Sequence, residues 1–388
     1  MTDARAKELS RRYERFFYNR PSISFIVAYS DGFECKLGES EASFSLRAID
    51  ATGDGALDSF DLIQIGEAYL ACSLELAGDL LLAMSMRSFF RDNHPLMWAA
   101  RFAPRLFLGS VRSDQKSIAH HYDEDPHFFR TFLDARHMCY TQGAFSSDDE
   151  NLEDAVTRKL DYAISSLGLS PGDKILDVGG GWGAFLQFAS ERGFHVTSLT
   201  LSHESEQFMR SIVGSRGLGN AEVIREHFLQ YKPSKRFHAI VNMGATEHLP
   251  DYAATLAQYQ NLLLPGGKVY VDALAMKNSH LVSTFMSKHV YPGYASPLVL
   301  HKYLRAVAKS PFLLRCVRDE RHNYYLSCRR WAERLDQASE SVVSTWGEEL
   351  YRRFRVFLWG STASFWTGHL QAYSLVVQLP DLDSAGRH

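Results

Sequence analysis

A cluster of glycines is the segment of this sequence best suited to hold a ligand. Asp177-Val-Gly-Gly-Gly-Trp-Gly183 follows the short apolar run Lys174–Val178 and precedes a helical pattern. Glycines let the backbone turn tightly and approach a ligand closely, and the N-terminus of the following helix offers free N–H groups. The spacing is not the G-x-G-x-x-G of a dinucleotide site, and Thr200-Leu-Ser202 supplies no acid for a ribose. The loop therefore predicts a ligand site that is neither a dinucleotide site nor a Walker loop.

Two carboxylates lie at or just after the ends of predicted strands. Glu247, in Gly244-Ala-Thr-Glu-His248, follows one predicted strand, and Asp272 lies at the end of the next, within 268–275. Carboxyl ends of parallel strands share one edge of a sheet, so both side chains are expected near its mouth. A structural hydrogen-bonding role for Glu247 and a capping or solvated role for Asp272 remain alternatives.

The surrounding pattern supplies the elements that would position these groups. Strands are predicted at 174–178, 195–201, 238–243 and 268–275, with helical spacing at 152–169 and between the strands. This alternation predicts an α/β domain with a doubly wound, mostly parallel sheet. Residues before about 105 show mixed apolar segments and a helix expected from Leu74 to Phe90. We therefore expect a smaller α+β domain at 1–105 and the larger domain at 106–388.

Composition excludes several classes of protein. Hydrophobic residues make up 45% and charged residues 22% of the 388-residue chain, and its net charge of −3 argues against a nucleic-acid partner. Neither a spanning apolar run nor an apolar signal segment is present, and five scattered cysteines fit a reducing cytoplasm. The His-rich segment 120–127 lacks the spacing of a metal site, so no metal is predicted.

The glycine loop resembles motif I of class I, Rossmann-like, S-adenosylmethionine-dependent methyltransferases. From about residue 118 onward, further segments resemble, in order, the cyclopropane fatty acid synthases and mycolic acid cyclopropane synthases: His121-Tyr-Asp123, Tyr140-Thr141, LEDAVTRKLD, VTSLTLS, Gly244–His248 and LLPGGKVYV. Residues 65–81 look like the N-terminal domain of full-length bacterial lipid-acting enzymes, which implies a lipid-binding-like role for residues 1–105.

The resemblance implies that S-adenosylmethionine is the cofactor, with S-adenosylhomocysteine as its product. The residues expected to bind it are Tyr122, Tyr140, Thr141, Asp177, Gly179, Gly181, Thr200, Leu201, Ser205, Glu226 and His227.

The same resemblance implies a catalytic set. The family uses a bound bicarbonate as base, held by a Glu, a His, a Tyr and a Cys-bearing segment, and the first and third of these correspond to Glu247 and Tyr324. Gln142 replaces the Cys and Asp272 replaces the His. A carboxylate at Asp272 would repel an anion and could itself accept a proton, which argues against bicarbonate in this chain. We therefore include Gln142 and Asp272 with Glu247 and Tyr324 as candidate catalytic residues.

These residues predict methyl transfer to a carbon–carbon double bond of an unsaturated fatty acyl lipid. The carbocation would close to a cyclopropane or lose a proton to give a methyl-branched product, depending on where the base lies. One alternative acceptor is a specialised metabolite, such as a polyketide, an isoprenoid or a carrier-bound acyl group. Another alternative is an idle lipid-binding relative, although the retained glycines and Glu247 argue against it. Peripheral contact with the inner membrane face and a homodimer are compatible with this hypothesis.

A set of arginines near the C-terminus leaves two interpretations open. A solvated helix face or a site for the phosphate of a lipid headgroup or carrier would both explain Arg329, Arg330, Arg334, Arg352, Arg353 and Arg355.

Overall fold

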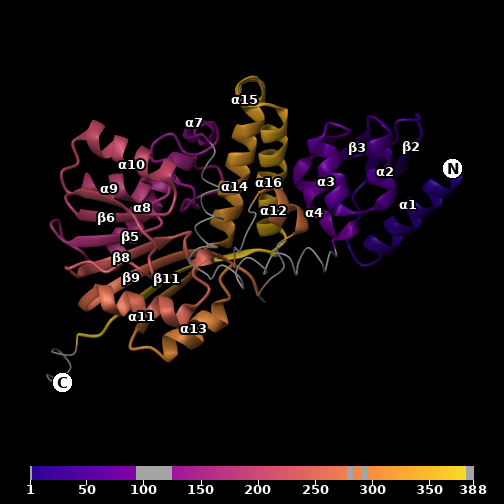
Figure 1. Ribbon diagram of the computed structural model, residues 1–388. Helices are drawn as coiled ribbons and strands as arrows, with labels where there is room; N and C mark the ends of the chain where they lie inside the picture. The colour runs from indigo at the N-terminus through magenta and orange to yellow at the C-terminus, as the bar shows by residue number, and fades with distance from the viewer. Residues whose placement is uncertain (1, 93–124, 278–282, 291–295, 382–388) are drawn as a thin grey trace.

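The computed structural model describes residues 2–92, 125–277, 283–290 and 296–381, and these residues form two sheets with their helices (Figure 1). The smaller sheet lies within the first 78 residues and the larger one within residues 174–378. The expected domain boundary near residue 105, and the predicted cofactor residue Tyr122, fall outside the described residues.

The N-terminal part begins with helix α1 (Thr2–Phe17) and contains a four-stranded sheet in the order β2-β1-β3-β4. Its strands are β1 (Phe25–Ala28), β2 (Glu34–Leu37), β3 (Phe44–Ala48) and β4 (Leu74–Gly78). Two helices, α2 (Ala51–Ser59) and α3 (Leu62–Leu70), connect β3 to β4. Side chains of the strands and helices share one apolar core, which Leu9 of α1 also joins.

The prediction of a helix from Leu74 to Phe90 is wrong for its first five residues. Residues 74–78 form β4, which pairs antiparallel with β3, and only α4 (Leu80–Ser85) and the short η1 (Arg87–Phe89) are helical. Leu74 and Leu76 are buried on either side of a less buried residue, which is the period of a strand. Gly78, with φ of 95°, and Asp79, which caps α4, then separate strand from helix.

The larger sheet confirms the predicted doubly wound architecture. It contains seven strands in the order β10-β11-β9-β8-β5-β6-β7. The parallel strands are β5 (Lys174–Val178), β6 (His195–Thr200), β7 (Ala221–Arg225), β8 (Phe237–Met243) and β9 (Leu263–Ala275). Two antiparallel strands, β10 (Leu313–Asp319) and β11 (Gln371–Gln378), complete the edge beside β9.

Helices cover both faces of this sheet (Figure 1). One core packs the sheet against α8 (Leu152–Leu167), α9 (Ala184–Ser190), α10 (His203–Arg216), α14 (Arg321–Gln337) and α16 (Glu348–Trp366). The other core includes α11 (Tyr252–Leu262) and α13 (Leu300–Ala308). Neighbouring residues such as Ile175 and Leu176 of β5 enter opposite cores, as the alternation of a buried strand requires. The remaining helices are α7 (Pro126–Phe129), η2 (Thr246–His248), α12 (Thr284–His289) and α15 (Ser339–Trp346).

Helix α16 joins the two parts of the molecule. Its Arg352 donates to the carbonyl oxygens of Tyr69 (3.0 Å) and Leu74 (3.2 Å) and pairs with Glu75 at 2.5 Å. Arg355 donates to the Tyr69 hydroxyl at 3.0 Å and pairs with Asp336 of α14 at 2.7 Å. These two arginines therefore fasten the N-terminal part to the helices beside the larger sheet, which neither interpretation of the arginine cluster anticipated.

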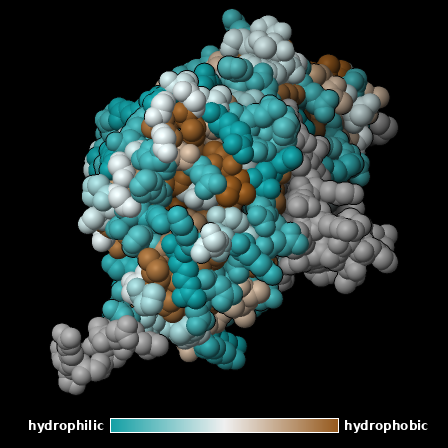
Figure 2. Space-filling model, turned by 60° about the vertical axis from the view of Figure 1, so that its left-hand side comes forward, coloured by the Kyte–Doolittle hydropathy of each residue, from teal (hydrophilic) through white to brown (hydrophobic). Residues whose placement is uncertain are grey.

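The surface that Figure 2 draws carries its apolar residues in small groups separated by hydrophilic ones. Among the helices that the structure describes, none has the length and apolar character needed to cross a membrane.

Candidate active site

A cavity of about 440 Å³ brings together most of the residues that the sequence singled out. One side is formed by the glycine loop and by residues at the carboxyl ends of β6, β8 and β9. The other side is formed by apolar residues of α3, β4 and α4 in the N-terminal part and by α12 and α16. The cavity therefore spans both parts of the molecule and combines a polar wall with an apolar one.

The glycine loop is held close to the neighbouring strand. The N–H groups of Gly179 and Gly180 both donate to the carbonyl oxygen of Leu199, at 3.0 and 2.9 Å. Gly179 has φ of 82°, and a Cβ atom there would lie 2.7 Å from the Cβ of Ala245. Gly181 also has positive φ, at 52°. The loop thus needs glycine for its backbone conformation and for its close packing, and it leaves backbone exposed to the cavity.

Asp177 lines the cavity behind this loop, but its side chain is engaged inside the protein. Its carboxylate accepts a hydrogen bond from the Ser198 hydroxyl at 2.7 Å, and burial raises its pKa to about 6. This contact ties the end of β5 to β6 beneath the glycines.

The other expected cofactor residues within the described part of the chain also line the cavity: Tyr140, Thr141, Gly179, Gly181, Thr200, Leu201, Ser205, Glu226 and His227. They come from the loop before α8, the glycine loop between β5 and α9, the end of β6, the start of α10 and the segment after β7. His227 is buried and accepts at Nδ1 from the Leu229 N–H at 3.2 Å. Their contact with the cofactor stays a prediction.

Glu247 presents an acidic group to the cavity. It lies in η2 and is 4% exposed, and its Oε1 accepts from the Leu274 N–H at 2.8 Å. Its Oε2 has no hydrogen-bond partner among the described residues. Burial raises the pKa of this carboxyl to about 8, and the negative charge of Asp272 adds to the increase. Glu247 is therefore a weak acid near neutral pH with one oxygen available for proton transfer.

Tyr324 lies on the same cavity in α14. Its ring stacks on Phe365 with 4.9 Å between centroids and 20° between planes, and burial raises the pKa of its hydroxyl. Aromatic faces of Tyr140 and Trp331 also line the cavity, 5.6 Å apart by their centroids. The wall near Glu247 thus offers polarisable rings of the kind that attract cations.

Asp272 and Gln142 lie behind the cavity wall and do not line it. Asp272 is fully buried inside β9, and its Oδ2 is 2.9 Å from Nζ of Lys159, which is 2% exposed. The side chain of Gln142 hydrogen bonds to Asp272. Asp272 shares a strand face with Tyr270, so it points toward α8 and not out of the end of the sheet. This placement favours a supporting role over direct contact with a substrate.

The two replaced residues do not fit a bound bicarbonate. The amide of Gln142, the carboxylate of Asp272 and the ammonium of Lys159 are engaged with one another, and a carboxylate disfavours an anion beside it. We therefore derive no step through that anion.

Sequence reasoning missed Lys159. A signal was present, because Lys159 follows Ala155 and Val156 and precedes Ala163 at helical spacing, and all three are buried. A lysine at such a position needs a buried acid, which the sequence does not reveal without the fold.

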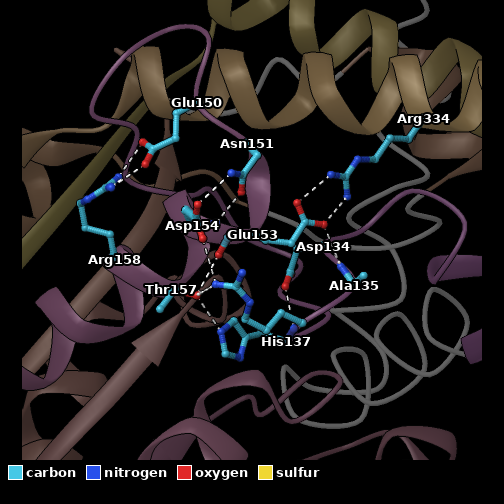
Figure 3. Close-up of polar contacts among 11 residues, drawn as sticks. Asp134, Ala135, His137, Glu150, Asn151, Glu153, Asp154, Thr157, Arg158 and Arg334 are labelled. Carbon is cyan, nitrogen blue, oxygen red and sulfur yellow. Dashed lines mark hydrogen bonds and ion pairs between the residues drawn. The ribbon is translucent and has the colours of Figure 1, made fainter.

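A second polar network, drawn in Figure 3, secures the segment that leads to Tyr140 and Thr141. Arg334 of α14 pairs with Glu153 of α8 at 2.9 Å, and Glu153 also accepts from the Ala135 N–H at 3.1 Å. His137 contacts the Thr157 hydroxyl through Nε2 at 2.9 Å. Burial raises the pKa of Glu153, but hydrogen bonds from Arg334 and from backbone N–H groups outweigh it and lower that pKa to about 2.

Within the described residues, no group of three His, Cys, Asp or Glu side chains is arranged to hold a metal ion. Most of the His-rich segment 120–127 lies outside those residues.

Comparisons with known proteins identify the family. The family model described as mycolic acid cyclopropane synthetase matches residues 110–375. A probable fatty acid methyltransferase of Pseudomonas putida is 26% identical over 353 residues, covering 86% of each chain. The tuberculostearic acid methyltransferase UfaA1 of Mycobacterium tuberculosis is 27% identical over 383 residues, covering 89% of this chain and 86% of that one.

A solved structure extends the likeness to the fold and the cofactor. The mycolic acid cyclopropane synthase CmaA1, complexed with SAH and CTAB, matches with a TM-score of 0.63 and 25% identity over 68% of this chain and 98% of that one. The glycine cradle, which a Cβ atom at Gly179 would fill, and the polar cavity beside it fit S-adenosylmethionine in this chain. The chain belongs to the mycolic acid cyclopropane synthetase family and is an S-adenosylmethionine-dependent methyltransferase.

Proposed function

We propose that this enzyme transfers a methyl group to a carbon–carbon double bond in an unsaturated fatty acyl chain of a lipid. The observation that carries the proposal is the shape of the cavity, which joins the glycine loop and Glu247 to an apolar wall. The relatives named above as a fatty acid methyltransferase and a tuberculostearic acid methyltransferase support an acyl substrate.

The apolar wall suits a hydrocarbon chain. Residues of the N-terminal part contribute to it, including Leu46, Ile65 and Leu76, and α16 contributes Val356 and Phe357. An isolated alkene is a weak nucleophile, so it must be held in line with the methyl group and kept from water. We assign this holding and exclusion to the N-terminal part together with α16, in agreement with a lipid-binding role for the N-terminal part.

When bound, S-adenosylmethionine supplies an electrophilic methyl group and needs no further activation. The residues of this chain then have to stabilise the carbocation and remove one proton. Three aromatic residues that line the cavity can stabilise the cation: Tyr140, Tyr324 and Trp331. Glu247, which also lines it, can accept the proton.

The position of the lost proton decides the product. Loss from the new methyl group closes a cyclopropane, whereas loss from a neighbouring carbon gives a methyl-branched alkene. Both kinds of product are consistent with the proposal, and mass spectra and NMR spectra of the isolated acyl chains would distinguish them.

Incubation with methyl-labelled S-adenosylmethionine tests this function. The full chain is mixed with vesicles of dioleoyl phospholipid, with distearoyl vesicles as the saturated control, and with carrier-bound acyl and isoprenoid acceptors. We expect label only in unsaturated acyl chains. Label in an isoprenoid alone would assign the enzyme to specialised metabolism, and S-adenosylhomocysteine binding without transfer to any acceptor would contradict the proposal. Sedimentation with the same vesicles measures peripheral membrane contact.

A further inference from the structure

A buried charge network lies behind the cavity wall. Lys159 of α8 and Asp272 of β9 are 2% and 0% exposed, and 2.9 Å separates Nζ from Oδ2. Burial disfavours the charged form of each, yet the pKa of Lys159 is raised, because the charge and hydrogen bond of Asp272, together with Cys139 and Glu320, outweigh the effect of burial. A lysine and an aspartate at this depth are tolerated only as a pair, since either one alone would be an unpaired charge in the core.

This network reaches the cavity by two short routes. Lys159 Nζ also donates to the Thr141 hydroxyl. The methyl group of Thr141 packs closely against Gly244, because a Cβ atom added to that glycine would lie only 2.8 Å from Thr141 Cγ2. Gly244, three residues before Glu247, donates its N–H to the Asp272 carbonyl oxygen at 2.8 Å. Two residues after Asp272 on the same strand, Leu274 donates to Glu247 Oε1. The main chain of β9 at Asp272 and Leu274 thus contacts both segments around Glu247, and Lys159 ties the Asp272 side chain and the Thr141 hydroxyl to that same place.

Titratable groups from two elements face Glu247. Asp272 on β9 raises its pKa, and Tyr324 of α14 interacts with it electrostatically. Cys328 of α14 and Cys139 of the segment before α8 in turn lie near Tyr324. Behind Asp272 lies Glu320, which accepts from the Ser374 hydroxyl at 2.7 Å and is 3.7 Å from Arg318. Among the buried acids that the structure describes, Glu247 is thus the one that lines the cavity and has an oxygen without a hydrogen-bond partner.

We propose that Lys159 is a positioning residue of the reaction, which holds Asp272 and Thr141 in place and so fixes Glu247 as the direct proton acceptor, with no added anion. This inference rests on the proposed function. The sulfur–methyl bond breaks with its electron pair left on sulfur, and the alkene pair forms the new carbon–carbon bond. A proton of the cation then moves to Glu247 Oε2, and the electron pair of that C–H bond closes the ring or forms a new alkene.

Proton release on cofactor binding tests the network without any methyl acceptor. Because the pKa of Glu247 is about 8, most molecules carry a proton on this carboxyl at pH 7. A sulfonium bound beside it favours the carboxylate, so S-adenosylmethionine should release most of one proton and neutral S-adenosylhomocysteine should release none. Calorimetry in buffers of different ionisation enthalpy measures this release.

The decisive variant is Lys159→Met/Asp272→Asn, which removes both buried charges together and so avoids leaving one unpaired. Without the charge of Asp272 the pKa of Glu247 falls, so proton release at pH 7 should be smaller than in the wild type, while the affinity for S-adenosylhomocysteine stays within about twofold. Glu247→Gln should abolish the release. Lys7→Met, in an exposed pair with Asp3, is the matched control and should change nothing.

Turnover provides the second readout. With unsaturated vesicles, the double variant should lose about 10-fold to 100-fold in kcat, and the acidic limb of its pH profile should move to lower pH. A merely structural role would lower kcat without moving that limb. Wild-type turnover should also be the same with bicarbonate added or removed.

The outcomes separate the two proposals. Failure of transfer to every acyl acceptor rejects the proposed function but leaves the proton release interpretable. Equal proton release in the wild type and the double variant, an unmoved pH profile, or a wild-type enzyme stimulated several-fold by bicarbonate would each overturn the role given to Lys159 and Glu247.

Discussion

The two walls of the cavity are built in different ways. The wall at the end of the sheet depends on the close backbone packing of Gly179 against Ala245 and on the buried pair of Lys159 and Asp272. The facing wall consists of apolar side chains from separate segments, which Arg352 and Arg355 hold together. A buried polar framework suits chemistry that needs fixed positions, whereas an apolar wall held by two arginines can accommodate chains of different shape. Changes on one wall should therefore leave the function of the other intact.

Glu247→Gln should have the largest effect on the sheet-side wall. The amide keeps the size of the side chain and an oxygen for the Leu274 N–H, but it cannot accept the proton. Turnover should fall by about 10³-fold, and calorimetry should show unchanged affinity for S-adenosylhomocysteine. Glu349→Gln, at an exposed position on α16, is the control. Turnover within a few fold of the wild type would remove Glu247 from the chemistry.

Arg352→Met should weaken the apolar wall without affecting the sheet-side wall. It removes contacts to Tyr69, Leu74 and Glu75, so the free energy of unfolding in urea should fall by about 2–3 kcal/mol. KM for unsaturated vesicles should rise several-fold while S-adenosylhomocysteine binds as before. Arg329→Met, which breaks an exposed pair with Glu333, should cost less than about 1 kcal/mol. A matching loss of cofactor affinity would show that the walls are not independent.

Two carboxyls of the sheet-side wall should make stability depend on pH. Burial raises the pKa of Glu247 to about 8 and of Asp177 to about 6, so the folded protein keeps protons that the unfolded chain has lost. Their contribution to stability is complete below the unfolded pKa values and disappears as pH rises through about 6 and 8. The contribution of these two carboxyls to the free energy of unfolding should therefore decrease by about 5 kcal/mol between pH 5 and pH 8.5. An equally steep decrease in Glu247→Gln would assign the effect to other groups.

Gly179→Ala should have the smallest effect and the most local one. The new Cβ atom meets Ala245, so the affinity for S-adenosylhomocysteine should fall about tenfold, or about 1.4 kcal/mol. Gly172→Ala is a matched control, because Gly172 has φ of 94° but a Cβ atom placed there would have nothing within 4 Å. Gly172→Ala should lose about 1 kcal/mol of stability from backbone strain alone, Gly179→Ala should lose more because of the added collision, and only Gly179→Ala should bind the cofactor more weakly. If Gly179→Ala and Gly172→Ala bound S-adenosylhomocysteine equally well, the glycine loop would not be part of the cofactor site.

Local patterns predicted the sheet-side wall well. The glycine loop and Glu247 depend on a strand, a turn and the residues that follow, so sequence alone placed them on the cavity. The direction of Asp272 depends on strand alternation and on which helix covers that face, so it was expected at the sheet mouth and lies behind the wall. Lys159 and Arg352 are charged residues whose burial requires partners distant in sequence. Such partners become visible only when the fold is known.

Strand β11 has a consequence for how the enzyme is made in the cell. It inserts between β9 and β10, so β9, which bears Asp272 and Leu274, gains its second neighbour only from residues 371–378. During synthesis, one edge of β9 therefore stays unpaired while more than ninety further residues are made, from the end of β9 at residue 275 to the start of β11 at residue 371. An open edge of Val, Tyr and Ala invites pairing with another chain. Ribosome-bound intermediates and products of late stop codons should accordingly depend on chaperones, and a cofactor-binding core should appear only once the final strand has emerged.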